Sequence, residues 1–259
     1  MAALPLAGKR VLVTRAAHQA SKLSEGLRDL GADPVEVPVI EIRPPEDFAL
    51  LDRALHELNS YDWLIFTSAN AVRALAERAA MLDLNLAAAV GFKVAAVGEA
   101  TATAARDAGF AVALVPETYV AESLTKSLAG YTRGKRVLLA RAAVARDVIP
   151  DSLRAAGATV AVVDAYRNVM PKSAPALLRE ALQKGIAAAA FTSSSSVTHL
   201  ADAARQEGIA FPFAGVAAIS IGPITSKTLC ELGWEPVTEA NPSDVPGLVV
   251  AVLRALAAH

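Results

Sequence analysis

The chain has 259 residues, of which 54% are hydrophobic and 20% charged, and its formal net charge is −1. This length suits two domains, and the composition is typical of a globular protein. The near-neutral charge argues against a polyanion-binding surface, so no nucleic-acid partner is expected. The single cysteine, Cys230, excludes an internal disulfide and fits a reducing compartment. Because Cys230 falls in a helical pattern, we expect its thiol to be packed in the core.

The two ends of the chain show no targeting signal. Residues 1–8 lack a basic leader and a long apolar segment, so no export signal is predicted. Arg254 interrupts the apolar C-terminal stretch, and no apolar run reaches the length of a membrane span. We therefore expect a cytoplasmic protein without a membrane partner.

The predicted strands follow one another in a regular rhythm. They are continuously apolar runs, which is typical of strands covered on both faces, and helical patterns follow most of them. This alternation predicts parallel sheets with right-handed crossovers. The expected strands are 10–14, 35–40, 63–66, 93–97, 112–115, 136–140, 160–165, 187–191, 217–221 and 235–238.

Two helices are predicted to end in the same way. Leu23, Leu27 and Leu30 fall on one helical face, and Gly31 follows in the position that a left-handed cap requires. Leu153 and Gly157 repeat this ending later in the chain. Two extended, proline-bounded segments, 38–45 and 163–171, occupy the same place in each half and are interpreted as crossing points between two lobes.

The chain repeats itself at a nearly constant offset. Four blocks recur in one order, which indicates two copies of one α/β module with a ligand cleft between the lobes. The recurring blocks are 8–17 with 134–143, 66–68 with 191–193, 97–98 with 221–222, and 120 and 124 with 245 and 249.

Hydroxyl-rich loops follow the predicted strands in both copies. Helices begin there, and free backbone N–H groups and the helix dipole attract anions, so we expect a carboxylate-bearing ligand. The alternative is that these Ser and Thr residues simply cap helices. The loops are 14–15, 67–70, 98–101, 192–196 and 222–225.

Common catalytic and cofactor motifs are missing from the sequence. There is no Gly-x-Gly-x-x-Gly after a strand, no Walker A loop and no Gly-x-Ser-x-Gly elbow. The four histidines are scattered without metal-ligand spacing. We therefore expect neither a metal nor an organic cofactor.

Six short motifs in one order identify a family that the chain resembles. They occupy 11–15, 66–72, 97–102, 165–167, 191–193 and 221–225, and Pro-Ser-Asp at 242–244 closes the series. In their order and spacing they resemble uroporphyrinogen-III synthase. The resemblance implies a cofactor-independent lyase of tetrapyrrole (heme) biosynthesis. Its reaction converts hydroxymethylbilane to uroporphyrinogen III, with loss of water and inversion of the last pyrrole ring.

The resemblance also implies the domain organisation. Two similar three-layer α/β lobes with parallel sheets are joined by a two-stranded β linker, and the active site lies in the inter-lobe cleft. One lobe is discontinuous, comprising 1–37 plus 172–259, and the other comprises 47–159. The linker strands are 38–46 and 160–171. We expect a monomer, because the duplication already supplies two lobes.

Site residues are carried over from the family by their motifs. Tyr166 matches a linker tyrosine proposed to assist departure of the substrate hydroxyl, although a tyrosine there could instead pin the linker against a lobe. Asn70 is expected to cap or shape its loop. Arg141 repeats Arg15, which leaves open whether Arg15 merely ends a strand. The residues assigned to substrate binding are Arg15, Ser68, Thr101, Ser193, Ser194 and Thr225.

Two other functions remain open from the residues alone. A non-catalytic two-lobe ligand binder would close its hinge over a small metabolite. A two-lobe glycosyltransferase would have the same architecture, but the sequence shows no basic nucleotide-phosphate motif.

Overall fold

The computed structural model describes residues 4–86 and 89–257, without the side chains of residues 17–19. The chain divides into two compact units. Unit 1 comprises Met1–Glu41 and Val169–His259, and unit 2 comprises Ile42–Asn168. Unit 1 is therefore built from two separate stretches of chain, whereas unit 2 is continuous.

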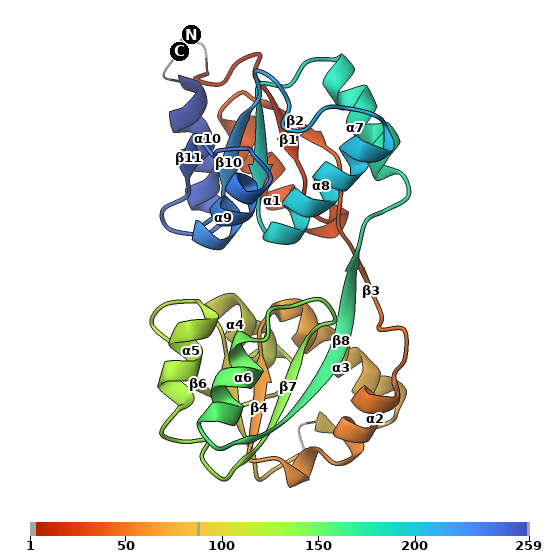
Figure 1. Cartoon of the computed structure of the whole chain (residues 1–259), viewed down its shortest axis with the longest axis vertical. Helices are drawn as coiled ribbons and strands as arrows, with labels where there is room; N and C mark the ends of the chain where they lie inside the picture. The colour runs from red at the N-terminus through yellow and green to blue at the C-terminus, as the bar shows by residue number, and fades with distance from the viewer. Residues whose placement is uncertain (1–3, 87–88, 258–259) are drawn as a thin grey trace. The chain divides into compact units, whose positions relative to one another are not determined.

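Unit 1 contains a five-stranded sheet in the order β11-β10-β9-β1-β2, with all neighbouring strands parallel. Helices α1 and α10 pack against each other on one face, and α7, α8 and α9 form the layer on the other face (Figure 1). The strands are β1 (Arg10–Val13), β2 (Asp33–Glu36), β9 (Ala188–Phe191), β10 (Ala217–Ser220) and β11 (Thr238–Glu239). The helices are α1 (Ala17–Asp29), α7 (Ala174–Gln183), α8 (Ser194–Gln206), α9 (Pro223–Glu231) and α10 (Val245–Ala257).

Unit 2 contains a six-stranded sheet in the order β3-β8-β7-β4-β5-β6, and the pairs from β8 to β6 are parallel. Helices α2, α3 and α4 pack on one face, and α5 and α6 on the other. The strands are β3 (Glu41–Arg43), β4 (Trp63–Phe66), β5 (Lys93–Ala96), β6 (Val112–Leu114), β7 (Arg136–Ala142) and β8 (Thr159–Val169). The helices are α2 (Ala49–His56), the 3-10 helix η1 (Leu58–Ser60), α3 (Ala69–Met81), α4 (Glu99–Asp107), α5 (Ala121–Leu128) and α6 (Val148–Ala155).

The two sheets are equivalent strand by strand, as the sequence repeat predicts. The order β11-β10-β9-β1-β2 becomes β6-β5-β4-β7-β8 when each strand is replaced by its repeat partner. The register is also preserved, because Leu12 pairs with Ala189 in unit 1 and the matching Leu138 pairs with Leu64 in unit 2. Each sheet therefore combines strands from both copies of the repeat.

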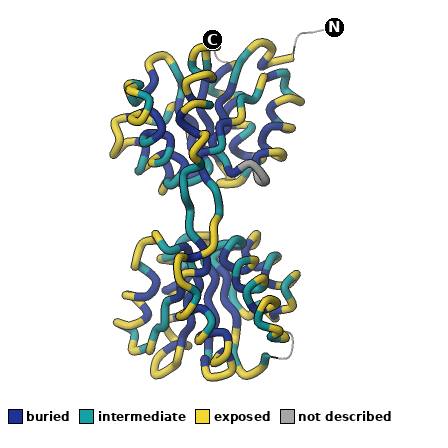
Figure 2. The backbone as a smooth tube through the Cα atoms, turned by 90° about the vertical axis from the view of Figure 1, so that its right-hand side faces the viewer, coloured by how far each residue is buried: buried dark blue, intermediate teal, exposed yellow. Residues whose placement is uncertain are grey.

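The core of unit 2 explains why its strands are continuously apolar. Along β4, Leu64 and Phe66 point into the layer formed by α2, α3 and α4. Trp63 and Ile65 point into the opposite layer beneath α5 and α6. All four side chains are buried, because helices cover both faces of the strand. Figure 2 shows that the backbone in the middle of each unit is mostly buried.

Two helices end at the glycines that the sequence singled out. Gly31 has a φ of +89° and Gly157 a φ of +90°. The amide of Gly31 donates to the Arg28 carbonyl, and that of Ala32 donates to the Leu27 carbonyl. This pair of bonds is a Schellman motif, in which the left-handed residue satisfies carbonyls left open at the helix end.

Two edge strands of unit 1 differ from the sequence-based expectation. The strand expected at 35–40 is β2 at Asp33–Glu36, and the one expected at 235–238 is β11 at Thr238–Glu239. Both strands lie at an edge of the sheet and pair with a neighbour on one side only. A third expectation was also wrong, because Cys230, expected in the core, is exposed on α9.

Candidate functional site

Helices α3 and α4 begin at the carboxyl ends of β4 and β5 in unit 2. Ser68 is the N-cap of α3, and its Oγ accepts a hydrogen bond from the Ala71 amide at 3.1 Å. Gly98 is the N-cap of α4. Because parallel strands end at one edge of a sheet, both helix N-termini lie along the same edge of unit 2. Such an edge favours anions and partial negative charge.

Tyr166 comes to this edge from β8. Its side chain belongs to the core of unit 2, and the residue is only 6% exposed. The phenol oxygen lies 3.0 Å from Ser68 Oγ, and Asn70 also forms a side-chain hydrogen bond with it. The structure therefore joins the tyrosine of the last strand to the N-terminus of α3, 98 residues earlier in the chain.

The surroundings of Tyr166 change its acidity in opposing ways. Burial is the largest effect and raises the pKa of the phenol above its usual value near 10, whereas the hydrogen bonds with Ser68 and Asn70 lower it. The net shift is upward, so the phenol keeps its proton at neutral pH. A group in this state can donate a proton but cannot act as a base.

Thr101 lies in the first turn of α4 and is 5% exposed. The turn is closed by hydrogen bonds from the Thr101 and Ala102 amides to the Gly98 carbonyl. Tyr119 covers the same turn, since a Cβ on Gly98 would lie 3.0 Å from its ring. Glycine at position 98 therefore allows Tyr119 to pack directly on the helix N-terminus.

The matching edge of unit 1 carries Ser193 and Ser194. Ser193 is the N-cap of α8, and it exchanges side-chain and backbone hydrogen bonds with Ser196 in a capping box. Ser194 Oγ donates to the Ile224 carbonyl and accepts from Thr228 Oγ1 at 2.7 Å. Ser194 thus links the start of α8 to α9 by hydrogen bonds.

Thr225 and Arg15 complete the predicted residues of unit 1. Thr225 is 4% exposed in the first turn of α9, at the position that Thr101 occupies in α4. Arg15 follows β1, where the preceding Thr14 donates a hydrogen bond to the Ala190 carbonyl of β9. Burial lowers the pKa of the Arg15 guanidinium from its usual value, because a desolvated cation is less stable than a hydrated one. A carboxylate bound to Arg15 would offset that penalty.

Arg141, the repeat partner of Arg15, is hydrogen-bonded to the loop that follows β7. Its guanidinium is tied to Asp147 at 2.7 Å and to the Arg146 carbonyl at 3.1 Å. Its Nε is buried without a hydrogen-bond partner. Arg141 therefore stabilises the conformation of the loop after β7.

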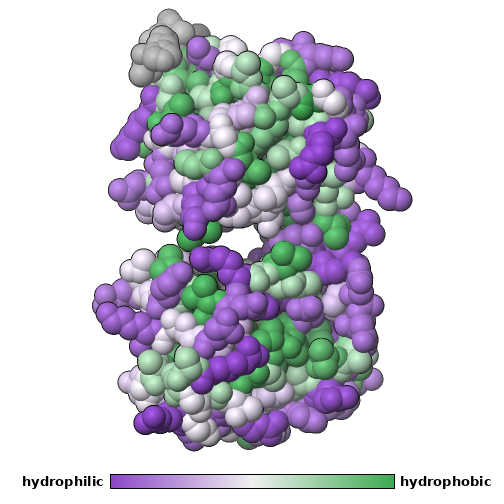
Figure 3. Space-filling model, in the orientation of Figure 1, coloured by the Kyte–Doolittle hydropathy of each residue, from purple (hydrophilic) through white to green (hydrophobic). Residues whose placement is uncertain are grey.

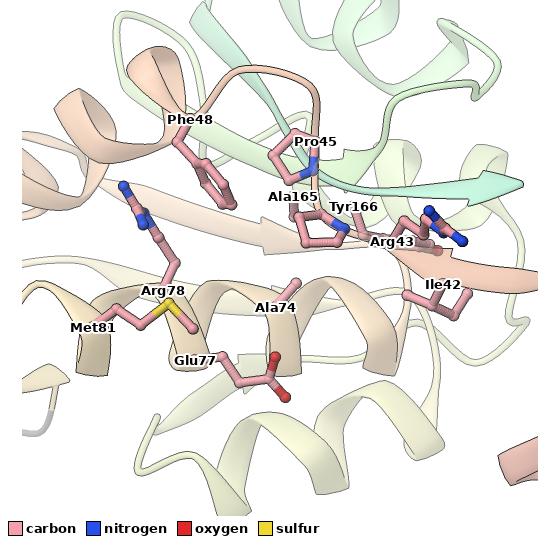
Figure 4. A pocket seen from close by; sticks show the side chains of 11 residues that line it. Ile42, Arg43, Pro45, Phe48, Ala74, Glu77, Arg78, Met81, Ala165 and Tyr166 are labelled. Carbon is pink, nitrogen blue, oxygen red and sulfur yellow. The ribbon is translucent and has the colours of Figure 1, made fainter.

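An apolar cavity of about 120 Å³ lies beside Tyr166 in unit 2 (Figure 4). Phe48, Ala74 and Met81 line it together with Tyr166, and Arg43 and Glu77 supply its charged groups. Arg78 closes one side, where its guanidinium lies 4.0 Å from the centre of the Phe48 ring. Tyr166 therefore borders this cavity as well as the core of unit 2.

The structure brings some of the predicted site residues together and places others in separate units. Ser68 and Tyr166 are in direct contact, and Thr101 begins the neighbouring helix of the same edge. Arg15, Ser193, Ser194 and Thr225 belong to the carboxyl edge of unit 1. Sequence reasoning missed the interaction of Asn70 with Tyr166, because Asn70 was expected to cap or shape its loop.

The described residues were also compared with the requirements of a metal site and of a membrane span. Within residues 4–86 and 89–257, no three His, Cys, Asp or Glu side chains are grouped closely enough to hold a metal ion. Over the same ranges, no helix combines the length and apolarity needed to cross a membrane. The face seen in Figure 3 mixes hydrophilic and hydrophobic residues in each unit.

At the carboxyl edge of each sheet, a serine therefore caps the helix that follows a central strand: Ser68 caps α3 and Ser193 caps α8. This arrangement is a feature of α/β proteins that bind anionic ligands at the carboxyl ends of their strands. Comparison with known proteins gives the particular family. A model described as "Uroporphyrinogen-III synthase HemD" matches residues 21–250, and the chain belongs to this family.

Individual relatives agree with the family model. The chain is 35% identical to a uroporphyrinogen-III synthase of Synechococcus elongatus, over 97% of each protein. Among solved structures, a mutant uroporphyrinogen III synthase of Thermus thermophilus has a TM-score of 0.69 at 22% identity, covering 97% of this chain and 100% of that one. A Helicobacter pylori uroporphyrinogen-III synthetase has a TM-score of 0.66 at 19% identity, covering 95% and 99%. These two structures share the fold described above.

Proposed function

We propose that this chain is a uroporphyrinogen-III synthase, a cyclising hydro-lyase of heme biosynthesis. It converts hydroxymethylbilane to uroporphyrinogen III, with loss of water and inversion of the last pyrrole ring. The observation that supports this most directly is the 35% identity to a synthase over 97% of both proteins. The matched helix N-termini of the two sheets support it independently.

The binding chemistry follows from the acidic groups of the substrate. Each pyrrole ring carries acetate and propionate arms, and the helix N-termini offer backbone N–H groups that suit carboxylates. Arg15 supplies a partly desolvated cation in unit 1. Thr101 and Thr225 begin equivalent helices, and we assign both to substrate binding. This mode of binding needs no strongly basic surface, which agrees with the net charge of −1.

We assign the proton donor for hydroxyl departure to Tyr166. As the C–O bond of the hydroxymethyl group breaks, the phenol proton passes to the departing oxygen and water leaves. The positive charge that remains is delocalised into the attached pyrrole. Ring closure later releases a proton from the attacked pyrrole carbon, and this proton restores the phenol. The raised pKa of Tyr166 keeps the donor protonated at neutral pH.

Isomer analysis of the product tests the proposed function. The protein is mixed with freshly generated hydroxymethylbilane, and the uroporphyrin isomers are separated after oxidation. We expect the type III isomer to dominate, because without enzymatic control the bilane closes without inverting its last ring. Type I product alone, formed at the enzyme-free rate by a folded sample, would refute the assignment.

The Tyr166→Phe variant tests the assigned proton donor. General acid catalysis contributes typically about 10²- to 10⁴-fold, so kcat should fall by this factor while the KM changes little. The variant keeps the buried ring, and its thermal unfolding shows whether the fold is intact. An unchanged kcat would remove Tyr166 from the mechanism and leave it the role of anchoring β8.

A further inference from the structure

The hydroxyl of Ser68 is held between two groups of unit 2. On one side, the Ala71 amide donates to Ser68 Oγ at 3.1 Å, so this oxygen already serves as the cap of α3. On the other side, Ser68 Oγ lies 3.0 Å from the phenol oxygen of Tyr166. A serine engaged in this way is poorly placed to bind a substrate carboxylate with its side chain.

The orientation of the Asn70 amide is set by Arg73. Arg73 Nη1 donates to Asn70 Oδ1 at 3.1 Å, which fixes the amide oxygen on the arginine side. The amide nitrogen is then the atom that faces away from Arg73, and Asn70 forms a side-chain hydrogen bond with Tyr166. Its two N–H groups can only donate, so the phenol oxygen is the acceptor.

The direction of these bonds matters for a proton donor. The phenol has one proton, and this proton is available to a substrate only if the phenol oxygen accepts, rather than donates, its bonds from the protein. Ser68 can meet this requirement, because its Oγ accepts from Ala71 and keeps its own O–H to donate. Tyr166 would then accept from both Ser68 and Asn70.

The same arrangement stabilises the anion that proton transfer leaves behind. A phenolate at this position would receive two hydrogen bonds and would lie at the N-terminus of the 13-residue helix α3, where the dipole favours negative charge. Both hydrogen bonds lower the pKa of Tyr166, in opposition to the burial that raises it.

We propose that Ser68 and Asn70 are positioning residues that hold the phenol oxygen of Tyr166 as an acceptor and direct its proton toward the substrate. This inference rests on the proposed role of Tyr166 as the proton donor. It assigns Ser68 a function different from the carboxylate binding that its sequence motif predicts.

The other unit supports a role beyond helix capping. Ser193 is the repeat partner of Ser68, but its capping box is completed within α8 by Ser196. Leu12 pairs with Val35 and Leu138 with Ala161, an offset of 126 residues. The position equivalent to Tyr166 in the first copy lies 126 residues earlier, and it is Ile40. A capped α8 therefore exists without any phenol, and the contact with Tyr166 is an additional property of Ser68.

Steady-state kinetics of Ser68→Ala and Asn70→Asp test the proposal. We expect each variant to lose about 10- to 100-fold in kcat with little change in KM, as for a lost hydrogen bond to a charged group. Ser68→Thr keeps the hydroxyl and should restore most of the rate. Introduced into Tyr166→Phe, neither Ser68→Ala nor Asn70→Asp should reduce kcat further, because both act through the phenol.

A control separates these effects from the loss of a side-chain hydrogen bond at a helix start. Asp47 Oδ1 accepts from the Ala49 amide at 2.8 Å, at the start of α2 in the same unit. Asp47→Ala should lower stability by a similar amount but leave kcat unchanged. If Ser68→Ala instead raises the KM without lowering kcat, Ser68 binds substrate and the proposal is wrong.

A spectroscopic titration provides a test that does not depend on activity. The phenolate absorbance of Tyr166 is obtained as the difference between each protein and its Tyr166→Phe counterpart. Ser68→Ala and Asn70→Asp should each raise the pKa of Tyr166. Unshifted titrations would refute the two-donor arrangement. A shifted pKa combined with a fully active Tyr166→Phe variant would support the two hydrogen bonds to the phenol. It would also show that Tyr166 is not the proton donor, and the catalytic role proposed for Ser68 and Asn70 would be refuted.

Discussion

Arg15 and Arg141 occupy the same position in a repeated block, and we propose different roles for them. Arg141 makes two hydrogen bonds with the loop at 146–147. Arg15 is partly desolvated, and the lowered pKa of its guanidinium records the cost of that burial. The repeat fixes the position of both residues, and we propose that Arg15 binds a substrate carboxylate whereas Arg141 binds its own loop.

Replacing each arginine by glutamine should separate these two functions. For Arg15→Gln we expect the KM to rise about tenfold or more with a small change in kcat, as for a lost bond to a substrate carboxylate. For Arg141→Gln we expect the free energy of unfolding to fall by about 1–3 kcal/mol. Steady-state kinetics and urea unfolding of both variants measure the difference. Equal effects on KM would contradict the separate assignments.

The sequence predicts the site residues individually but not their contacts. Ser68 and Tyr166 were both identified by motif, yet their hydrogen bond joins positions 98 residues apart. It depends on the register shift between Arg141 and Ala142, after which Tyr166 pairs with Ala142 of β7. Local patterns do not encode such a shift, so the role of Asn70 could not be predicted either.

At the scale of helices, the glycine caps give a matched pair for stability. Gly31 and Gly157 share a left-handed backbone, which costs an alanine about 1–2 kcal/mol. A Cβ at Gly31 would lie 2.6 Å from Leu4 Cβ, whereas one at Gly157 would meet only the flexible Arg133 side chain, at 3.4 Å. We therefore expect Gly31→Ala to destabilise the protein by about 1 kcal/mol or more beyond Gly157→Ala. Chemical denaturation of both variants checks the order, which a larger loss in Gly157→Ala would contradict.

The ion pair between α2 and α3 gives a pH-dependent prediction. Two hydrogen bonds from Arg78, each 2.6 Å long, hold the pKa of the Asp52 carboxyl below its usual value. A lowered folded-state pKa stabilises the protein above the unfolded value near 4, and this stabilisation is lost as the pH falls through the folded value. The Tm difference between the wild type and Asp52→Asn should therefore shrink between pH 6 and pH 3.

Asp107→Asn provides the control for this prediction. Asp107 is exposed in the last turn of α4, and the pairing of Asp52 does not involve it. Its replacement should not reproduce the loss of acid-dependent stability. A Tm difference for Asp52→Asn that is constant with pH would show that the pair does not contribute through ionisation.

Local sequence patterns predict the bounds of the central strands more accurately than those of β2 and β11. The central strands β4, β5, β9 and β10 lie within one residue of their expected bounds, because two covered faces leave a continuous apolar run. Of the strands that pair on one side only, β2 and β11 were misplaced, whereas β6 lies within one residue of its expected bounds. Burial specifies the centre of a sheet more strongly than its margin.

At the scale of the whole molecule, the two sheets exchange parts of the repeat. β1 belongs to the first copy yet pairs with β9 of the second, and β7 of the second copy pairs with β4 of the first. The repeat alone is equally compatible with two sheets that each use one copy. Only the strand order decides between these arrangements, and it leaves unit 2 as one continuous stretch of chain.

A fragment of residues 41–169 should therefore fold by itself. It contains β3 and β8 in full and both apolar layers of the unit 2 sheet. None of the strands that the structure describes in it pairs with a strand of unit 1. We expect a cooperative thermal transition and native-like circular dichroism. We also expect no type III product, because Arg15, Thr225 and the helix N-termini of unit 1 are absent. A fragment without a cooperative transition would show that unit 2 depends on unit 1 for stability, and an active fragment would refute the substrate-binding role proposed for the unit 1 residues.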